Sequence, residues 1–141
     1  MEAGVCVHAA VREPENDRKV EHLKKLSENG PGSVVLVKTD LLESGSFVKA
    51  MEGCNLVFHI ASPFITKFND AQKDLIDPAL LGTKNVLATA NLTSSVERII
   101  LTSSTVATYG DAAEIANLPN GTLTENNWNV TSSAKHQPYS Y

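Results

Sequence analysis

The stretch VCVHAAV, residues 5–11, decides which fold class the sequence predicts. Its side chains are apolar almost without interruption, and Pro14 follows shortly after. This pattern is typical of a β-strand that is covered on both faces in a parallel sheet. Comparable strand-length runs are predicted as strands at residues 34–38, 55–60 and 98–102.

Segments with helical spacing separate these strands. Residues 18–28 place Val20, Leu23 and Leu26 three apart among Lys and Glu, which predicts a surface helix. Residues 46–51 predict a short helix capped by Ser46. Residues 75–92 predict a longer helix with Pro78 in its first turn, where a missing N–H does no harm. Strand and helix thus alternate, which predicts an α/β fold with a doubly wound parallel sheet.

Length, charge and composition exclude several classes of function. The 141 residues, 42% of them hydrophobic, suit one globular domain with a core of its own. A net charge of -4 offers no basic surface to nucleic acid or anionic lipid. The apolar runs are far shorter than the ~20 residues that a membrane span requires. Residues 1–10 lack the features of a secretory signal, so we expect a cytoplasmic protein with neither nucleic acid nor membrane as a partner.

Four side chains that can look functional are predicted to be structural. Cys6 and Cys54 form neither a CxxC motif nor a pairing with clustered histidines, and we expect both to be inert thiols of the core. His59 has no evident carboxylate or histidine partner and is expected to pack in the sheet. Trp128 is expected to anchor the long polar segment 111–138. We therefore predict no metal site.

The residues that follow each strand are the candidates for ligand binding, because doubly wound sheets bind ligands beyond the carboxyl ends of their strands. Arg12 follows the first strand and Lys19 lies in the next helix, where the two cations indicate a 2′-phosphate, as in NADP. The alternative interpretation of Arg12 is a solvated strand end. Asp40 follows the second strand, where it either accepts from an adenine amino group or caps its own turn.

A hydroxyl group and a phenol follow the fourth strand. That strand ends in Leu101-Thr102-Ser103-Ser104, and the sequence closes with Pro138-Tyr139-Ser140-Tyr141. Hydride transfer to a carbonyl carbon builds an alkoxide, which must be hydrogen-bonded and protonated by a nearby acid. A serine that orients the substrate and a tyrosine that protonates it would perform this chemistry together.

An ordered series of motifs carries a family resemblance. The chain resembles the plant-type dihydroflavonol reductase and cinnamoyl-CoA reductase group of extended short-chain dehydrogenases over nearly its whole length, from Gly4 to Tyr141. The motifs, in chain order, are Val11-Arg12-Glu13-Pro14, Lys19-Val20-Glu21-His22-Leu23, Asp40-Leu41, Gly45-Ser46-Phe47, Gly53-Cys54, Val57-Phe58-His59-Ile60-Ala61-Ser62-Pro63, Asp77-Pro78-Ala79, Gly82-Thr83-Lys84-Asn85-Val86-Leu87 and Thr102-Ser103-Ser104.

The resemblance implies a Rossmann-type fold, NADPH as hydride donor and a Ser, Tyr, Lys active site. The serine would be the second of its pair, Ser104 rather than Ser103. Tyr139 would open the Tyr-x-x-x-Lys motif, whose lysine falls two residues beyond Tyr141. The implied cofactor contacts are Arg12 and Lys19 for the 2′-phosphate, Asp40 and Leu41 for adenine, and Ala61, Ser62, Thr102 and Tyr139 toward the nicotinamide.

The sequence departs from the family pattern at both ends. The family begins with a strand and a glycine-rich turn that binds the pyrophosphate, and nothing before Gly4 supplies them. We therefore expect an incomplete Rossmann-type sheet without the first strand, the first helix and the C-terminal region. Residues 1–141 would form a partial NADP-binding domain that ends at the start of the tyrosine motif. Its sheet would carry a gap or a bare edge.

The function implied is that of an NADPH-dependent reductase whose partner is a small-molecule carbonyl substrate. The substrate would be an aldehyde, ketone or CoA-thioester of phenylpropanoid, flavonoid or polyketide type, and the 141 residues alone would be inactive. Two alternatives stand beside this hypothesis. One is a dinucleotide-binding module that senses the redox state of NADP, which would not require Ser104 and Tyr139. The other is a truncated, non-catalytic chain that captures a partner at its bare strand edge.

Overall fold

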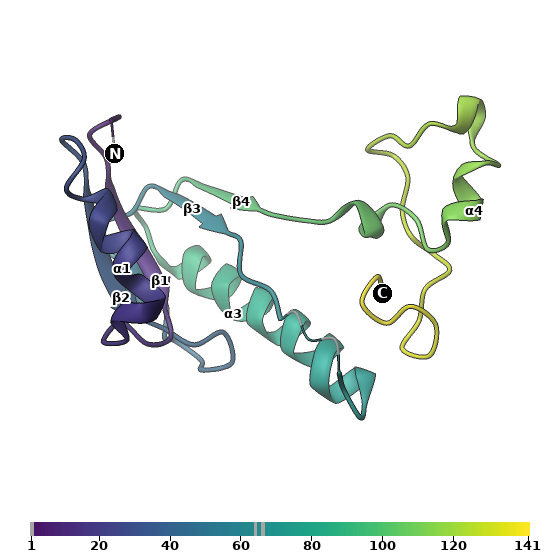
Figure 1. Ribbon diagram of the computed structural model, residues 1–141, viewed down its shortest axis with the longest axis horizontal. Helices are drawn as coiled ribbons and strands as arrows, with labels where there is room; N and C mark the ends of the chain where they lie inside the picture. The colour runs from purple at the N-terminus through teal and green to yellow at the C-terminus, as the bar shows by residue number, and fades with distance from the viewer. Residues whose placement is uncertain (1, 64, 66) are drawn as a thin grey trace. The chain divides into compact units, whose positions relative to one another are not determined.

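The computed structural model describes residues 2–63, 65 and 67–141 (Figure 1). The chain forms two structural units, Met1–His59 with Gly82–Ile100 and Ile60–Leu81 with Leu101–Tyr141. The predicted alternation of strands and helices is confirmed. The elements are β1 (Cys6–Val11), α1 (Asp17–Leu26), β2 (Ser33–Lys38), α2 (Val48–Met51), β3 (Leu56–His59), a π-helical turn (Gln72–Ile76), α3 (Asp77–Leu92), β4 (Arg98–Leu101), a 3-10 turn (Thr105–Ala107), α4 (Ala112–Ile115) and a second 3-10 turn (Pro119–Gly121).

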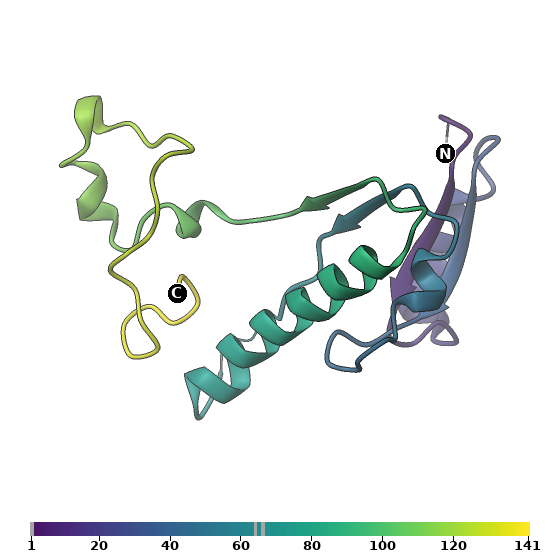
Figure 2. The ribbon, with the colours of Figure 1, turned by 180° about the vertical axis from the view of Figure 1, so that it is seen from behind.

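A parallel pair of strands organises the first unit. β1 pairs with β2 in a register that runs from Cys6 opposite Ser33 to Val11 opposite Lys38. α1 lies across one face of this pair and α2 on the other, as Figures 1 and 2 show from opposite sides. On the inner side of α1, Val20 is 1% exposed, whereas Leu26 at the end of the predicted apolar face remains 46% exposed. The helices cover the pair only in part: Val37 is its one buried residue, and Val7 and Val35 remain exposed, so the full coverage predicted from the apolar sequence is not reached.

The main apolar cluster of the first unit forms where α2, α3 and the short strands meet. Its buried members come from α2 with the residue before it and from the second half of α3. Partly buried residues from the loop after β2, from β3, from the turn between α3 and β4, and from β4 pack against them. The buried residues are Phe47, Met51, Val86 and Ala90, and those packed against them are Leu41, Val57, Val96 and Ile99.

The four strands form two separate sheets rather than one continuous sheet. β1 pairs only with β2, and β3 only with β4, among the residues that the structure describes. The starts of β3 and β4 are joined through the Asn55 carbonyl, which accepts from the backbone N–H of Glu97 at 2.8 Å and of Arg98 at 3.2 Å. The predicted four-strand sheet is thus interrupted between β1 and β3. This is the gap expected for a Rossmann-type sheet that lacks its first strand.

The open edge of β1 explains an incorrect prediction about the thiols. Cys6 was expected in the core, but it is exposed because no strand covers that side of β1 within the described chain. Cys54 is half-buried, and burial, with a smaller effect of the nearby Cys6, raises the pKa of its thiol. Only Cys54 thus has the inert character predicted for both cysteines.

Two of the three predicted helices, those at residues 46–51 and 75–92, begin differently in the structure. Ser46 does not cap α2; its hydroxyl instead donates to the Asp40 carbonyl at 2.6 Å and so closes the loop after β2. Pro78 lies in the first turn of α3, yet helical backbone already begins at Gln72 in a π-helical turn. A proline ring crowds the carbonyl four residues earlier, here that of Asp74, and a widened π turn is a way to accommodate it.

Asn85 fastens α3 to the loop after β2. Its side-chain Nδ2 donates to the carbonyls of Leu41 at 3.1 Å and Glu43 at 2.7 Å, and its Oδ1 accepts from the N–H of Gly45 at 3.2 Å. One turn earlier, a Cβ at Gly82 would lie 3.1 Å from the Leu41 Cβ, so helix and loop are in close contact. The position of Leu41 therefore depends on α3.

We predict that Asn85→Ala lowers the free energy of unfolding by roughly 1–3 kcal/mol, because loop carbonyls and an N–H lose their partners. Urea denaturation followed by circular dichroism measures the loss. Asn91→Ala, at an exposed position of the same helix, is the matched control and should stay within about 0.5 kcal/mol of the unaltered chain. Equal stability of the two variants would contradict the role given to Asn85.

Candidate active site

Arg12 and Lys19 lie together at the carboxyl end of β1. They line a hollow of about 160 Å³, whose other lining residues are Val11, Glu13 and Val20. Lys19 forms an ion pair with Glu13, and the hydrogen bond from this ammonium group is the main cause that lowers the pKa of the Glu13 carboxyl. Both partners are about half exposed, so water screens the pair and it adds little stability.

This arrangement suits a small dianionic group. Arg12 forms no ion pair within the described residues, so its guanidinium is available to a phosphate. A phosphate would have to compete with Glu13 for Lys19, and the cost is small because that pair is exposed. The residues present therefore fit the 2′-phosphate of NADP, which is the predicted ligand of Arg12 and Lys19.

Asp40 and Leu41 follow β2 in a tight loop. The Asp40 carboxylate accepts from the N–H of Leu42 at 2.9 Å, so the turn-capping interpretation describes what this side chain does in the structure. Its backbone N–H donates to the Ser46 hydroxyl at 3.2 Å. These bonds leave acceptor capacity on the carboxylate, and the adenine contacts of Asp40 and Leu41 stay a prediction.

The residues after β3 and β4 divide into buried and exposed ones. His59, the last residue of β3, is 5% exposed, and burial lowers the pKa of its imidazole. The prediction that it packs in the sheet is confirmed. Ala61 and Ser62 lie two and three residues after β3, Thr102 directly follows β4, and all three are exposed. They are accessible to a ligand beyond the strand ends, and their nicotinamide contacts remain a prediction.

Ser104 and Tyr139 both belong to the second unit. Ser104 is exposed and caps the 3-10 turn Thr105–Ala107, where its hydroxyl oxygen accepts from the N–H of Val106 at 3.4 Å. Because the oxygen is the acceptor, the hydroxyl hydrogen can be directed at a substrate oxygen. The Tyr139 side chain is 50% exposed. Both predicted catalytic groups are therefore accessible to solvent and to a substrate.

Sequence reasoning missed a network of polar side chains that connects the two segments carrying these groups. Asn129 lies at its centre and donates from Nδ2 to the carbonyls of Val106 and Ser140, each at 3.0 Å. Trp128 was expected to anchor this region, but it is 74% exposed and the neighbouring Asn129 holds the segments instead. The only sequence signal was the polar character of the long segment, which marks no single asparagine.

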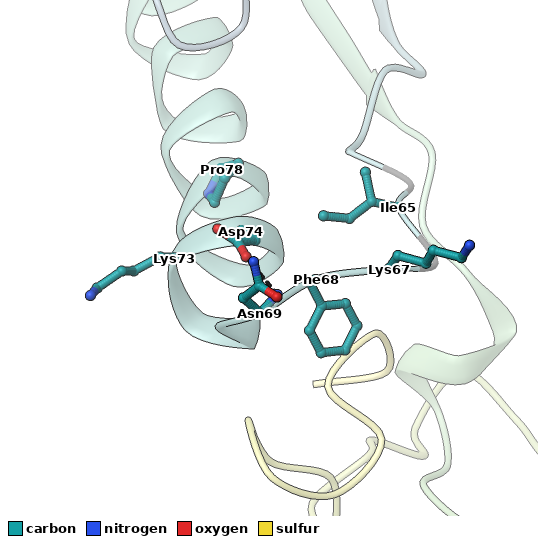
Figure 3. Close-up of a pocket in the computed structure, with 7 residues that line it drawn as sticks. All are labelled: Ile65, Lys67, Phe68, Asn69, Lys73, Asp74 and Pro78. Atoms are coloured by element: carbon teal, nitrogen blue, oxygen red, sulfur yellow. Dashed lines mark hydrogen bonds between the residues drawn. The ribbon is translucent and has the colours of Figure 1, made fainter.

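A larger hollow of about 710 Å³ also lies in the second unit (Figure 3). The Asp74 carboxylate on its wall accepts from the N–H groups of Asn69 at 3.0 Å and Asp70 at 3.1 Å, so this charge serves the loop itself. Figure 3 shows Lys73 directed away from the other lining residues. None of the predicted site residues, all of which are described, lines the hollow, so its size does not make it the candidate active site. The lining residues are Ile65, Lys67, Phe68, Asn69, Lys73, Asp74 and Pro78.

Two further findings concern the described part of the chain. No group of three or more His, Cys, Asp or Glu side chains there is placed to hold a metal ion. No helix there has the length and apolar character needed to cross a membrane.

Comparison with known proteins decides the family. The sequence profile of the 3-beta hydroxysteroid dehydrogenase/isomerase family matches residues 8–138. The chain belongs to this family. An anthocyanidin reductase of Arabidopsis thaliana is 37% identical over 145 residues, which cover 100% of this chain and 40% of the relative. A cinnamoyl-CoA reductase of Medicago truncatula is 45% identical over 107 residues, or 76% of this chain and 32% of the relative. The resemblance to plant reductases is confirmed.

A solved structure that is similar to this chain supports the Rossmann-type fold. The yeast methylglyoxal/isovaleraldehyde reductase Gre2, complexed with NADPH, superposes with a TM-score of 0.69 and 27% identity. The superposition covers 93% of this chain and 40% of Gre2. The chain thus spans about 40% of the length of Gre2 and of the anthocyanidin reductase. The predicted fold, a Rossmann-type α/β sheet that is incomplete, is confirmed.

We predict that the buried His59 makes stability depend on pH. Its pKa is lowered in the folded state, so the unfolded chain binds the proton first as the pH falls below about 6.5. The free energy of unfolding should fall from pH 7.5 toward the folded-state pKa, below which this contribution is constant. His59→Phe should flatten the decline in the urea midpoint between pH 7.5 and 5.5. His22→Gln, at an exposed position, is the control, and parallel curves for His59→Phe and the unaltered chain would exclude the effect.

Proposed function

We propose that residues 1–141 are the cofactor-binding part of a longer NADPH-dependent reductase that acts on a carbonyl compound. The observation that supports the proposal is that one side chain, Asn129, links the segments of Ser104 and Tyr139. Both of these residues are accessible and belong to one unit. A chain that only bound a dinucleotide would not require this pair. Because the chain spans 40% or less of the curated relatives described above, activity is proposed for the longer protein.

The proposed chemistry assigns one task to each side chain. NADPH supplies a hydride to the carbonyl carbon of the substrate. The Ser104 hydroxyl donates a hydrogen bond to the carbonyl oxygen and so fixes its direction. The Tyr139 phenol gives its proton to the same oxygen as negative charge develops there, and an aldehyde or ketone substrate thereby becomes an alcohol. A lysine four residues after Tyr139, as the family motif implies, would lower the pKa of the phenol.

The cofactor preference rests on the first unit. Arg12 forms no ion pair in the described residues and shares a hollow with Lys19 and Glu13. An arginine at this strand end pairs with the 2′-phosphate that distinguishes NADP from NAD. The NADPH complex of Gre2 supports the same choice for a relative of this fold. We therefore propose NADP(H) rather than NAD(H).

The proposed substrate class is a phenylpropanoid, flavonoid or polyketide carbonyl. The names of relatives support it: anthocyanidin, cinnamoyl-CoA and a tetraketide alpha-pyrone appear in them as the compounds reduced. The compounds in these names differ in ring system. We therefore propose the class of substrate and no single compound.

We predict that Tyr139→Phe, in the protein expressed from its complete coding sequence, lowers kcat by about 10²-fold or more because the alkoxide loses its proton donor. The KM for NADPH should stay within about twofold. Steady-state oxidation of NADPH with a panel of cinnamoyl and flavonoid carbonyls provides the measurement. Tyr141→Phe, which alters an exposed phenol two residues away, is the matched control with unchanged turnover. Near-normal kcat for Tyr139→Phe would remove the proposed function, and NADPH binding without turnover in the unaltered protein would favour the dinucleotide-binding alternative.

We predict that Arg12→Gln raises the KM for NADPH by roughly 10- to 100-fold, which corresponds to losing a charge-assisted hydrogen bond of about 1.5–3 kcal/mol. The KM for NADH should change little because NADH lacks the 2′-phosphate. Arg18→Gln, at an exposed position of α1, serves as the matched control for the loss of one positive charge. A proportional rise for both cofactors would show that Arg12 supports the fold and not the 2′-phosphate.

A further inference from the structure

The side chain of Asn129 joins the two segments that carry Ser104 and Tyr139. Its Nδ2 lies 3.0 Å from the carbonyl oxygen of Val106, two residues after Ser104. The same nitrogen lies 3.0 Å from the carbonyl oxygen of Ser140, the residue after Tyr139. One donor group thus sets how far apart these two stretches of backbone lie.

The orientation of the Asn129 amide is fixed by its partners. Its Oδ1 accepts from the backbone N–H groups of Thr131 at 3.3 Å and Ser132 at 3.1 Å, whereas Nδ2 faces the two carbonyls and also the Ser132 hydroxyl at 2.8 Å. Backbone N–H groups only donate and carbonyls only accept, so a flipped amide would lose all four backbone bonds. Two amide hydrogens serve three acceptors, so one hydrogen is shared.

The surroundings hold Asn129 in place. Its backbone N–H donates to the Ala107 carbonyl at 2.9 Å, next to the bond that its side chain makes with Val106. Thr131, two residues on, hydrogen-bonds to Glu114, which also completes the capping box of α4 with Asp111. A Cβ at Gly110 would lie 2.0 Å from the Thr131 Oγ1, so the neighbouring backbone packs directly against this group.

We infer that Asn129 is a positioning residue for the proposed reduction. In this role it acts through Ser104 and Tyr139 and not on the substrate itself: by holding the carbonyls of Val106 and Ser140, it keeps the Ser104 turn and the Tyr139 segment together so that both groups can act on one carbonyl oxygen. A displacement of about 1 Å between reacting groups costs on the order of 10²-fold in rate, so a bond that sets this separation controls kcat. The inference rests on the proposed function, because it needs Ser104 and Tyr139 to act on the same oxygen.

Asn129→Asp tests the donor role of the amide most directly. It keeps the size of the side chain and the oxygen that accepts from Thr131 and Ser132, but it cannot donate and it brings a negative charge against two carbonyl oxygens. Asn129→Ser is a milder variant that retains one donor and one acceptor on a shorter side chain. Asn126→Asp is the matched control, since Asn126 is an exposed asparagine of the same segment.

The experiment uses the reductase expressed from its complete coding sequence. The concentration of folded sites is measured by titration with NADPH, and kcat is given per NADPH-binding site with a cinnamoyl or flavonoid carbonyl that the unaltered protein reduces. We expect Asn129→Asp to lower kcat per site by 10- to 100-fold, Asn129→Ser to lower it less, and Asn126→Asp to change it by less than twofold. The affinity for NADPH should stay within twofold for all three variants.

A second readout separates positioning from loss of folded protein. With NADPH deuterated at the transferred position, the isotope effect on kcat should rise in the Asn129 variants, because misplaced groups slow the chemical step. A merely structural role would reduce the number of NADPH-binding sites and leave kcat per site and the isotope effect unchanged. That result would overturn the inference. If Asn129→Asp does not fold, kcat per site and the isotope effect of Asn129→Ser decide whether Asn129 is a positioning residue.

The failure of the inference and the failure of the proposed function give different results. If Tyr139→Phe loses turnover while both Asn129 variants keep normal kcat per site, the reductase function stands and the role of Asn129 is wrong. If Tyr139→Phe retains turnover, the proposed function is wrong whatever the Asn129 variants do.

Discussion

The parallel pairing of β1 with β2 is the interaction on which the candidate cofactor site depends. The register brings Val11 and Lys38 side by side at the last position of both strands. Arg12 and Asp40 therefore leave the sheet at the same edge, and α1, packed on this pair through Val20, places Lys19 beside Arg12. A slip of one residue in this register would turn every side chain of one strand to the other face. The hollow that Arg12 and Lys19 line is thus a consequence of strand pairing. The ion pair between Lys19 and Glu13 has only a secondary effect on it.

The two units are stabilised by different forces. Of the buried hydrophobic side chains in the described residues, only Leu75 belongs to the second unit. The long polar segment there buries little apolar surface, so its course is determined by hydrogen bonds that the carboxylates of Glu114 and Asp111 accept and that the Asn129 amide donates. Such bonds are directional and each contributes modestly, which suits a segment that must hold catalytic groups in defined places. Trp128 is likewise exposed, in a unit whose one buried hydrophobic side chain among the described residues is Leu75.

The errors of sequence interpretation concern residues whose surroundings are set by the folded backbone and not by the local pattern. Serine is a residue type that often caps helices, but the Ser46 hydroxyl donates its hydrogen bond to the Asp40 carbonyl. Cys6 lies in an apolar strand, yet the strand borders an open sheet edge. Asn129 resembles its exposed neighbour Asn126 in sequence, and only the folded backbone of Val106 and Ser140 distinguishes the two. Local pattern cannot predict these contacts, because each joins residues that the sequence does not place side by side.

The family resemblance implied the Rossmann-type class and the choice of Ser104. The residues by themselves determined the order of strands and helices, the α/β class with parallel strands, and the strand ends after which Arg12 and Asp40 lie. They could do so because apolar periodicity and strand-end chemistry are local properties of the chain. The tertiary structure alone decided that the strands divide into two sheets, that Asn85 ties α3 to the loop after β2, and that Asn129 links the segments of Ser104 and Tyr139. These features depend on hydrogen bonds across 11 to 44 positions of the chain, and only the packing of the folded backbone selects such partners.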